Sequence, residues 1–442
     1  MNRIIKKISI IFVVIFLLLS TKIYSQESQT LGFDTLNNKI EQLQTDFGLL
    51  KKLKISGYVQ AQYQIADSAG ASSFAGGNFP AGIDKRYQVR RGRLKFNYAT
   101  SLSNFVVQFD ITENQFKTKD AYFSFTEPLF KTLSLQAGIF DRPFGFEIHY
   151  SSSVRESPER SRLFQTVFPD ERDLGAMITF KLPKKSPLSF ITVQGGLFNG
   201  IGPSATDFDK YKDFIGQIYL KKSYLKDKLR ARIGASYYNG GFANGTKYVY
   251  SDIYTTSDEI KAYSLDSTAS NKGGRNKRED IGFDAQITYD SPIGLTELRG
   301  EYVMGSQPTS SSTSSSPKAA LTSDTYIRNF NGYYFYFVQN IAKTKHQLVF
   351  KYDVYDPNTD VTGSEIGVTT TNKELSNIKK QIATTKADIK YSTIGLGWIY
   401  HWDSNIKVMA YYDMVTNETT KSGQYNKDQK DNVFTLRVQY KF

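Results

Sequence analysis

The sequence predicts an all-β protein, namely a transmembrane antiparallel β-barrel of about 16 strands. Three observations support this prediction: apolar and polar residues alternate in short runs, long and short connections alternate between those runs, and the chain begins with an export signal. A soluble sandwich has no reason to place its long loops at one end, whereas a membrane barrel does. Mean hydropathy is −0.42, and no later run of about eighteen apolar residues suggests a spanning helix.

The composition of the 442-residue chain argues against an enzyme. The chain has no cysteine and only three histidines, His149, His346 and His401. Disulfides, thiolate metal sites and cysteine nucleophiles are therefore excluded, and little remains for a histidine-based triad or metal site. His346 and His401 fall at predicted periplasmic strand ends, and His149 has only serines nearby. We expect no catalytic residue, no metal and no cofactor.

The first 25 residues have the features of a secretory signal peptide. Arg3, Lys6 and Lys7 precede an apolar run at 8–19, which is too short for a spanning helix of about twenty residues. We expect cleavage after residue 25, which lowers the net charge from +13 to +9 because the leader carries four cations and no acid. Nucleic acid is not expected as a partner of an exported chain.

Residues 26–53 are expected to form a periplasmic linker that contains a short coiled-coil-like helix. Within it, apolar residues alternate at spacings of four and three, the pattern of a coiled-coil seam. The pattern covers only about two heptads, so a plain linker and a short oligomerising helix both remain open. The residues that carry the pattern are Leu36, Ile40, Leu43, Phe47 and Leu50.

The barrel is expected to occupy residues 54–442. Each predicted strand has about ten residues, the length that a tilted strand needs to cross a bilayer. In each predicted strand, the alternation of apolar and polar residues indicates one apolar and one polar face. The predicted strands are 55–65, 87–98, 104–111, 118–125, 132–140, 173–181, 188–198, 213–221, 229–238, 280–289, 295–304, 331–340, 346–355, 389–401, 405–415 and 434–442.

The connections between these strands predict the orientation of the barrel. Long connections, such as 141–172, 239–279 and 305–330, alternate with short ones, such as 99–103 and 402–404. In outer-membrane barrels the short turns are periplasmic and the long loops external. Because the predicted strand number is even, both termini are expected in the periplasm.

The two faces of the predicted strands have the chemistry that a bilayer requires. Positions expected to face lipid, such as Phe105, Leu135 and Leu396, include no charge. A lysine or arginine there would cost about 2–4 kcal/mol at mid-depth. Aromatic residues near strand ends, such as Tyr289 and Trp402, are typical of interfacial girdles.

Several segments resemble the phosphate-selective porin O and P family. They are residues 88–95, 138–145, 196–200 and 351–357, and the terminal Phe442 is similar to the insertion signal of such barrels. The resemblance implies a sixteen-stranded trimeric porin in the Gram-negative outer membrane. It also implies that the third external loop folds into the lumen and that arginines and lysines line the constriction.

Inward-facing cations are the candidate pore-lining residues. Arg91, Arg93 and Lys95 lie at i, i+2 and i+4, so their side chains are expected on one face about 6–7 Å apart. Such a ladder could pass an oxyanion from site to site, although an ordinary solvated wall with paired acids is the other interpretation. Arg230 and Arg232 are expected to face the lumen from another strand.

The third external loop, 141–172, is the best candidate for narrowing the pore. Its charges are nearly balanced, so it is either a selective filter, with arginines that contact oxyanions in bidentate fashion, or a self-neutralising plug. Its candidate anion-binding residues are Arg155, Arg160, Arg162 and Arg172. In the loop at 305–330, the Ser/Thr run 309–316 is expected to be a mobile surface segment.

The sequence therefore favours an outer-membrane porin for passive diffusion of small hydrophilic solutes, with a preference for anions of the phosphate or polyphosphate class. The alternative is an adhesin or structural barrel that acts through its long external loops. The expected partners are outer-membrane lipid, small anions such as phosphate, the barrel-assembly machinery through Phe442, and further copies of the chain in a homotrimer.

Overall fold

The computed structural model describes residues 51–203, 206–257, 259–368 and 383–442, together with Lys39, Glu41 and Gly48. Leu53–Phe442 forms one compact unit. The predicted signal peptide (1–25) and linker helix (26–53) lie almost entirely outside the described residues, so the structure offers no support for a helix there. Within the described part, no helix is long and apolar enough to span a membrane.

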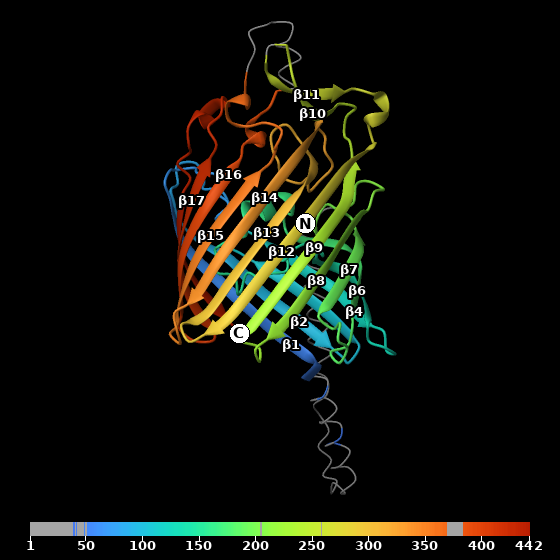
Figure 1. Cartoon of the computed structure of the whole chain (residues 1–442), viewed down its shortest axis with the longest axis vertical. Coiled ribbons are helices and arrows are strands. Elements are labelled where there is room, and N and C mark those ends of the chain that lie inside the picture. Colours follow the sequence, from blue (N-terminus) through green and yellow to red (C-terminus); the bar gives the residue numbers. More distant parts are fainter. Residues whose placement is uncertain are drawn as a thin grey trace, which may run out of the picture. The chain divides into compact units, whose positions relative to one another are not determined.

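Sixteen strands of the described chain close into an antiparallel barrel (Figure 1). Each strand pairs with the next, and β1 pairs with β18, which leaves no open edge. Every predicted run coincides with one of these strands, which confirms the predicted fold class. The strands are β1 (Leu53–Ala66), β2 (Lys85–Ala99), β3 (Ser103–Ile111), β4 (Phe116–Thr126), β5 (Leu133–Asp141), β6 (Arg172–Lys181), β7 (Ile191–Phe198), β8 (Asp213–Tyr224), β9 (Leu229–Ala243), β12 (Arg275–Ser291), β13 (Gly294–Thr309), β14 (Thr325–Asn340), β15 (His346–Asp356), β16 (Tyr391–His401), β17 (Ile406–Asn417) and β18 (Val433–Lys441).

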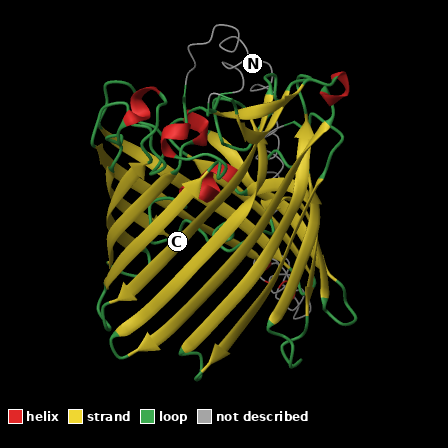
Figure 2. Cartoon of the chain, turned by 45° about the horizontal axis from the view of Figure 1, so that its top comes forward, coloured by secondary structure: helices red, strands yellow, loops and turns green. Residues whose placement is uncertain are grey.

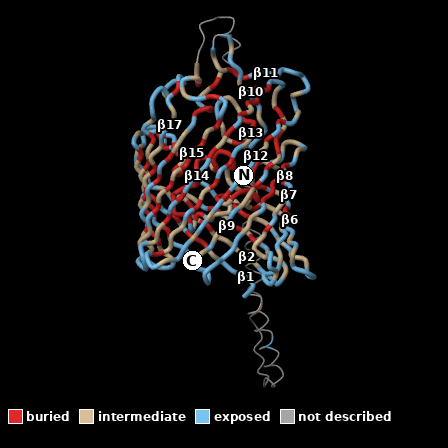
Figure 3. The backbone as a smooth tube through the Cα atoms, viewed as in Figure 1, coloured by how far each residue is buried: buried red, intermediate tan, exposed pale blue. Residues whose placement is uncertain are grey.

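Side chains alternate between the two faces of this wall as the sequence predicts. Phe105 and Leu396 point outward and are 53% and 49% exposed, whereas Gln60, Gln62 and Gln64 point inward and are buried. Buried positions gather in the middle and upper parts of the barrel, and the turns at the lower end are exposed (Figure 3). The interior is therefore filled with side chains over much of its height.

The long connections lie together at one end of the barrel and the short turns at the other, as Figure 2 shows. We call these the long-loop end and the short-turn end. The long-loop end also carries elements that the sequence analysis did not predict. They are the hairpin of β10 (Val249–Thr255) and β11 (Lys261–Asp266), the helix α3 (Arg162–Val167), and the 3₁₀ turns η1 (Ala269–Asn271), η2 (Gly363–Glu365), η3 (Lys386–Asp388) and η4 (Gly423–Asn426).

Two β-bulges bring extra charge into the lumen. The pairing of β1 with β2 skips Arg90, and the pairing of β3 with β4 skips Lys119. A bulge leaves one extra residue unpaired and bends the strand that contains it. Arg90 and Arg91 consequently both reach the interior, and so do Lys119 and Asp120. Strict alternation would have placed only one member of each pair there.

The middle of the Ser/Thr run lies at the surface as the sequence predicts, with Ser312 and Thr313 exposed, but its two ends, Thr309 and Ser316, are buried. Ser316 is buried, and its hydroxyl donates to the carbonyl of Val167 at 2.7 Å. That carbonyl lies at the last residue of α3, where no intrahelical partner exists. Arg278 donates to the same carbonyl at 3.0 Å, so the run packs against the third external loop.

Candidate functional site

The third external loop folds into the barrel. We call residues 142–171, between β5 and β6, the inserted loop. Most of its apolar side chains are buried, among them Phe144, Ile148 and Phe164, although Val154 is exposed. Phe164 and the neighbouring aromatic Phe168 pack edge-on against inward-facing tyrosines of the wall. These loop side chains and inward-facing side chains of the wall form one apolar core, and each buried side chain of this size stabilises by about 1.5–3 kcal/mol.

Polar contacts hold the inserted loop on several strands at once. Glu301 of β13 accepts the backbone N–H groups of Phe146 and Glu147, each at 3.2 Å. On the other side, Arg437 of β18 donates to the carbonyl of Pro158 at 2.8 Å. If the backbone N–H and C=O groups of the loop were buried without hydrogen-bond partners, they would strongly destabilise the fold. The wall therefore fixes both the position and the path of the loop.

Two polar cavities lie on either side of the inserted loop. The larger, of about 640 Å³, opens at the short-turn end, where Lys54 and Lys441 line it. The smaller, of about 180 Å³, lies toward the long-loop end beside Lys318. Arg93 and Arg160 line both cavities, so the two meet at these side chains. This junction is the candidate constriction of a path through the barrel.

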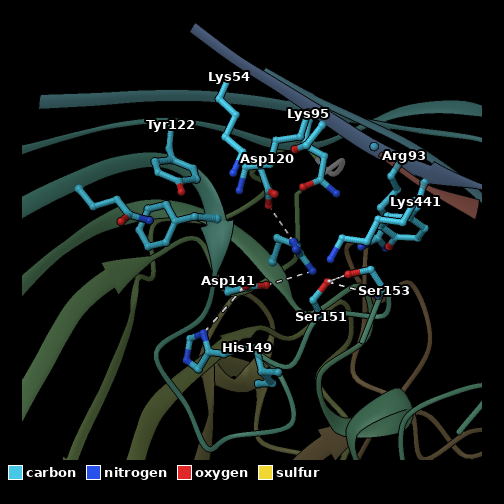
Figure 4. A pocket seen from close by; sticks show the side chains of 18 of the residues that line it. Lys54, Arg93, Lys95, Asp120, Tyr122, Asp141, His149, Ser151, Ser153 and Lys441 are labelled. Atoms are coloured by element: carbon cyan, nitrogen blue, oxygen red, sulfur yellow. Dashed lines mark hydrogen bonds and ion pairs between the residues drawn. The ribbon is translucent and has the colours of Figure 1, made fainter. Parts of the chain in front are cut away.

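The larger cavity has a basic wall and a mixed wall (Figure 4). Lys54, Arg93, Lys95 and Lys441 line one side of it. Asp141 and the inserted-loop residues His149, Ser151 and Ser153 face them across the space.

The predicted ladder residues share one wall, but their surroundings differ. The guanidinium of Arg91 lies 2.5 Å from the carboxylate of Glu159, and that of Arg93 lies 3.5 Å from Asp110. Lys95 lines the larger cavity, and no described carboxylate forms an ion pair with it. Two of the three cations are thus paired with acids, whereas the ammonium group of Lys95 remains available to a solute in the cavity.

Glu159 is the hub of the first charged cluster. Its carboxylate lies 2.8 Å from Arg90, 2.5 Å from Arg91 and 3.3 Å from Arg437. Burial alone would raise the pKa of Glu159, but the three arginines hold that pKa well below its usual range. The carboxylate therefore remains charged and joins the inserted loop to both β2 and β18.

Glu171 is the hub of the second charged cluster, at the junction of the cavities. Its carboxylate accepts from Lys119 at 2.7 Å, from Arg172 at 3.0 Å and from Arg160. Arg172 also lies 2.8 Å from Asp120. The surrounding cations outweigh the effect of burial and hold the pKa of Glu171 well below its usual range.

Arg155 is buried in the inserted loop, and its three guanidinium nitrogens find no hydrogen-bond acceptor among the described residues. Burial, together with the nearby charges of Arg160 and Arg91, lowers the pKa of Arg155 to about 9. This side chain lines neither of the two cavities. Among the predicted arginines of the inserted loop and β6, only Arg160 and Arg172 line these cavities.

The remaining candidate residues lie away from the junction. Arg162 is stacked between the rings of Phe74 and Tyr391, with its guanidinium carbon 4.2 and 3.7 Å from their centroids. Arg232 faces the lumen and lies 3.3 Å from Asp284. Arg230 is exposed at the short-turn end of β9.

Of the three histidines of the chain, only His149 lines one of the two cavities. Its Nε2 lies 3.0 Å from the side-chain amide of Gln217. Burial, reinforced by nearby arginines, lowers the pKa of His149 to about 3, so the ring is neutral at ordinary pH.

Lys119, like Arg90, is a residue of the candidate site that the sequence analysis missed. It binds Glu171, yet the alternation rule assigns the inward position to its neighbour Asp120. The available signal was the adjacent pair of opposite charges in a strand that needs an uncharged outer face. Such a pair is compatible with the bilayer only if the strand is bulged and both side chains turn inward.

A closed barrel, an inserted loop and a charged lumen define the class of porin-type outer-membrane barrels. Two solved structures with this fold are OprB of Pseudomonas putida and the outer-membrane channel DcaP of Acinetobacter baumannii. OprB is 11% identical, with a TM-score of 0.55 over 91% of this chain and 97% of OprB. DcaP is 12% identical, with a TM-score of 0.51 over 88% of this chain and 97% of DcaP.

The family model described as phosphate-selective porin O and P matches residues 81–196. The match confirms the resemblance seen in the sequence and supports an outer-membrane channel. It covers β2 to β6 and most of β7, and therefore includes the inserted loop and both charged clusters except for Arg437. A comparison with curated proteins gave no match.

Proposed function

We propose that the protein is a porin that lets small hydrophilic anions, of the phosphate or polyphosphate class, diffuse across the outer membrane. The inserted loop forms its constriction, and Arg93 and Arg160 lie at the narrow point. Lys95 and the paired cations around it supply the preference for anions. No residue acts as a catalyst in this function, and solutes move down their own concentration gradients.

The charge of the two cavities is the observation that carries this proposal. Rings of one sign select ions where a pore is narrow enough for the field to act within about 8–10 Å. Six lysines and arginines but only two side-chain carboxylates line the larger cavity. Seven lysines and arginines and four carboxylates line the smaller one. The cations are Lys54, Arg93, Lys95, Arg160, Arg172 and Lys441 in the larger cavity, and Arg90, Arg91, Arg93, Lys117, Lys119, Arg160 and Lys318 in the smaller.

We place the short-turn end in the periplasm and the long-loop end outside. This orientation follows the rule for bacterial barrels and puts both ends of the barrel wall, Leu53 and Phe442, on the periplasmic side. The same proposal includes three further points: export through the predicted signal peptide, recognition of Phe442 by the assembly machinery, and a homotrimeric assembly. The family resemblance supports each of them.

Reversal potentials in planar bilayers test the proposed function. The full-length mature protein is purified from outer membranes and placed in a tenfold gradient of potassium chloride. We expect stable conductance steps and a reversal potential whose sign shows a larger permeability for chloride than for potassium. A potential of the opposite sign would refute the anion preference, and the absence of conductance would favour the adhesin or structural barrel.

A further inference from the structure

The carboxylate of Glu171 has the surroundings that a bound oxyanion would have. Its two oxygens accept hydrogen bonds from Lys119 at 2.7 Å, from Arg172 at 3.0 Å and from Arg160. Charge-assisted bonds from guanidinium and ammonium groups are the interactions by which proteins hold phosphate. Glu171 is the only described carboxylate that forms an ion pair with Lys119 and Arg160, whereas Arg172 also forms ion pairs with Asp120 and Asp141.

This carboxylate lies where the two cavities meet. Arg160 lines both cavities, Arg172 lines the larger, and Lys119 and Glu171 line the smaller. A solute that moves from one cavity to the other passes beside the three cations. It must then either compete with the carboxylate for them or pass without binding them.

The backbone holds Glu171 in this place at a conformational cost. Asp170 and Glu171 have φ angles of +65° and +62°, in the left-handed region that residues with a β-carbon rarely adopt. Such a conformation is destabilising and persists only where the surroundings of the residue enforce it. The N–H of Glu171 donates to the carbonyl of Phe168 at 3.1 Å, and the N–H of Arg172 donates to that of Asp170 at 2.7 Å.

The strained turn sends the two adjacent carboxylates to different partners. The carboxylate of Asp170 lies 2.5 Å from Lys318 and 3.8 Å from Lys117, both at the outer side of the smaller cavity. Glu171 instead points to the cations at the junction. The conformation of the turn therefore directs the side chain of Glu171 toward the junction of the two cavities.

We propose that Glu171 is a specificity-determining residue of the anion path, because its carboxylate occupies the place of a permeating oxyanion and competes with it. The inference rests on the proposed function. A tethered competitor is present at an effective concentration of about millimolar or more, so it weakens oxyanion binding without blocking it. Chloride passes without having to displace the acid, whereas phosphate must displace it to bind in bidentate fashion. The pore therefore binds phosphate weakly and releases it rapidly, as conduction requires.

The test compares the native protein with Glu171→Gln, which removes the charge and keeps the shape. Inorganic phosphate is the probe in two measurements: inhibition of the chloride current in planar bilayers, and calorimetric binding to the purified barrel in detergent. We expect the phosphate concentration for half-inhibition and the Kd to fall by about tenfold in the variant. The matched control is Glu259→Gln, which removes the same charge from an exposed position in the turn between β10 and β11.

The outcomes separate this inference from the proposed function. Unchanged phosphate inhibition and binding in Glu171→Gln, or an equal change in the control, would overturn the role of Glu171 even if the pore prefers anions. A native pore without anion preference would overturn the proposed function, and the calorimetric comparison would still decide whether Glu171 competes for the cations. If Glu171→Gln yields no heat-modifiable barrel, Glu171→Asp takes its place. Its shorter acid should give a smaller fall in Kd, and no fall would overturn the inference.

Discussion

The carboxylate of Glu301 on β13 accepts the backbone N–H of Glu147 at 3.2 Å, and this contact ties the start of the inserted loop to the wall. The same carboxylate accepts the N–H of Phe146 and the hydroxyl of Tyr334, the latter at 2.9 Å. One buried acid thus supports two consecutive residues of the loop.

Removal of this support should loosen the loop without opening the barrel. We expect Glu301→Ala to raise single-channel conductance and current noise, because the variant loses several hydrogen bonds to the loop and each contributes about 0.5–1.5 kcal/mol. Recordings in planar bilayers give both quantities. Glu279→Ala is the control, since Glu279 bonds Lys277 and not the inserted loop. Equal noise in the two variants would contradict the anchoring role.

Lys95 should contribute more to anion preference than Arg91. The Arg91 guanidinium is buried and held by Glu159, whereas Lys95 lines the larger cavity directly. We expect Lys95→Gln to lower the chloride-to-potassium permeability ratio more than Arg91→Gln. The effect should be largest at about 0.01 M salt, where the Debye length is about 30 Å. Lys343→Gln, in a turn at the short-turn end, is the matched control. A larger effect of Arg91→Gln would support the ladder interpretation instead.

The stability of the barrel should depend on pH through Glu159 and Glu171. The folded-state pKa of each lies well below the usual value, so between the folded and unfolded pKa values the unfolded chain binds more protons. The stabilisation is therefore fully present above the unfolded pKa of about 4.3 and is lost as the pH falls through the folded pKa. We expect the contribution of these two acids to the urea midpoint to be constant from pH 8 to pH 5 and to decline below about pH 4.5.

The variant Glu159→Gln tests which acid produces that decline. It removes one of the two depressed carboxylates, so the midpoint should fall at pH 7 and then change less with acidification than in the native protein. An identical slope in both proteins would exclude Glu159 as a source of the pH dependence.

Phe442 should be required for closure of the barrel. Its N–H donates to the carbonyl of Gly57 at 2.9 Å and its carbonyl accepts from the N–H of Gly57 at 3.2 Å. Its ring lies so close that a β-carbon on Gly57 would be 2.7 Å from it. We expect deletion of Phe442 to reduce the heat-modifiable fraction in outer membranes strongly, and Phe442→Tyr to preserve it. Normal assembly after the deletion would refute this expectation.

The strands were predictable because a membrane wall imposes one rule on every strand. Each outward position must be apolar, so Phe105 or Leu396 marks the face of its strand without knowledge of any other strand. The same rule fails where a bulge adds one residue. Arg90 and Lys119 fall at such positions, and nothing in their own strands fixes the point at which the pairing skips.

The site was predictable only in part. The near balance of charge in the third external loop indicated acids and bases that neutralise one another. The partners of Glu159 come from β2 and β18, however, and the partners of Glu171 include a residue of β4. Such pairs depend on how the loop crosses the lumen, and that path is set by packing of Phe144 and Phe164 rather than by local sequence.

The contacts of the inserted loop at the β1–β18 pair bear on the order of folding. Ser152 accepts from Gln60 of β1 at 2.9 Å, and Ser153 accepts from Gln439 of β18 at 2.9 Å. Gln60 and Gln439 are 379 residues apart and also bond each other at 2.8 Å. Contacts between the first and last strands therefore form around a segment from the first half of the chain. Because joining such distant segments carries a large loop-closure entropy, we expect the pairing of β1 with β18 to follow the packing of the inserted loop.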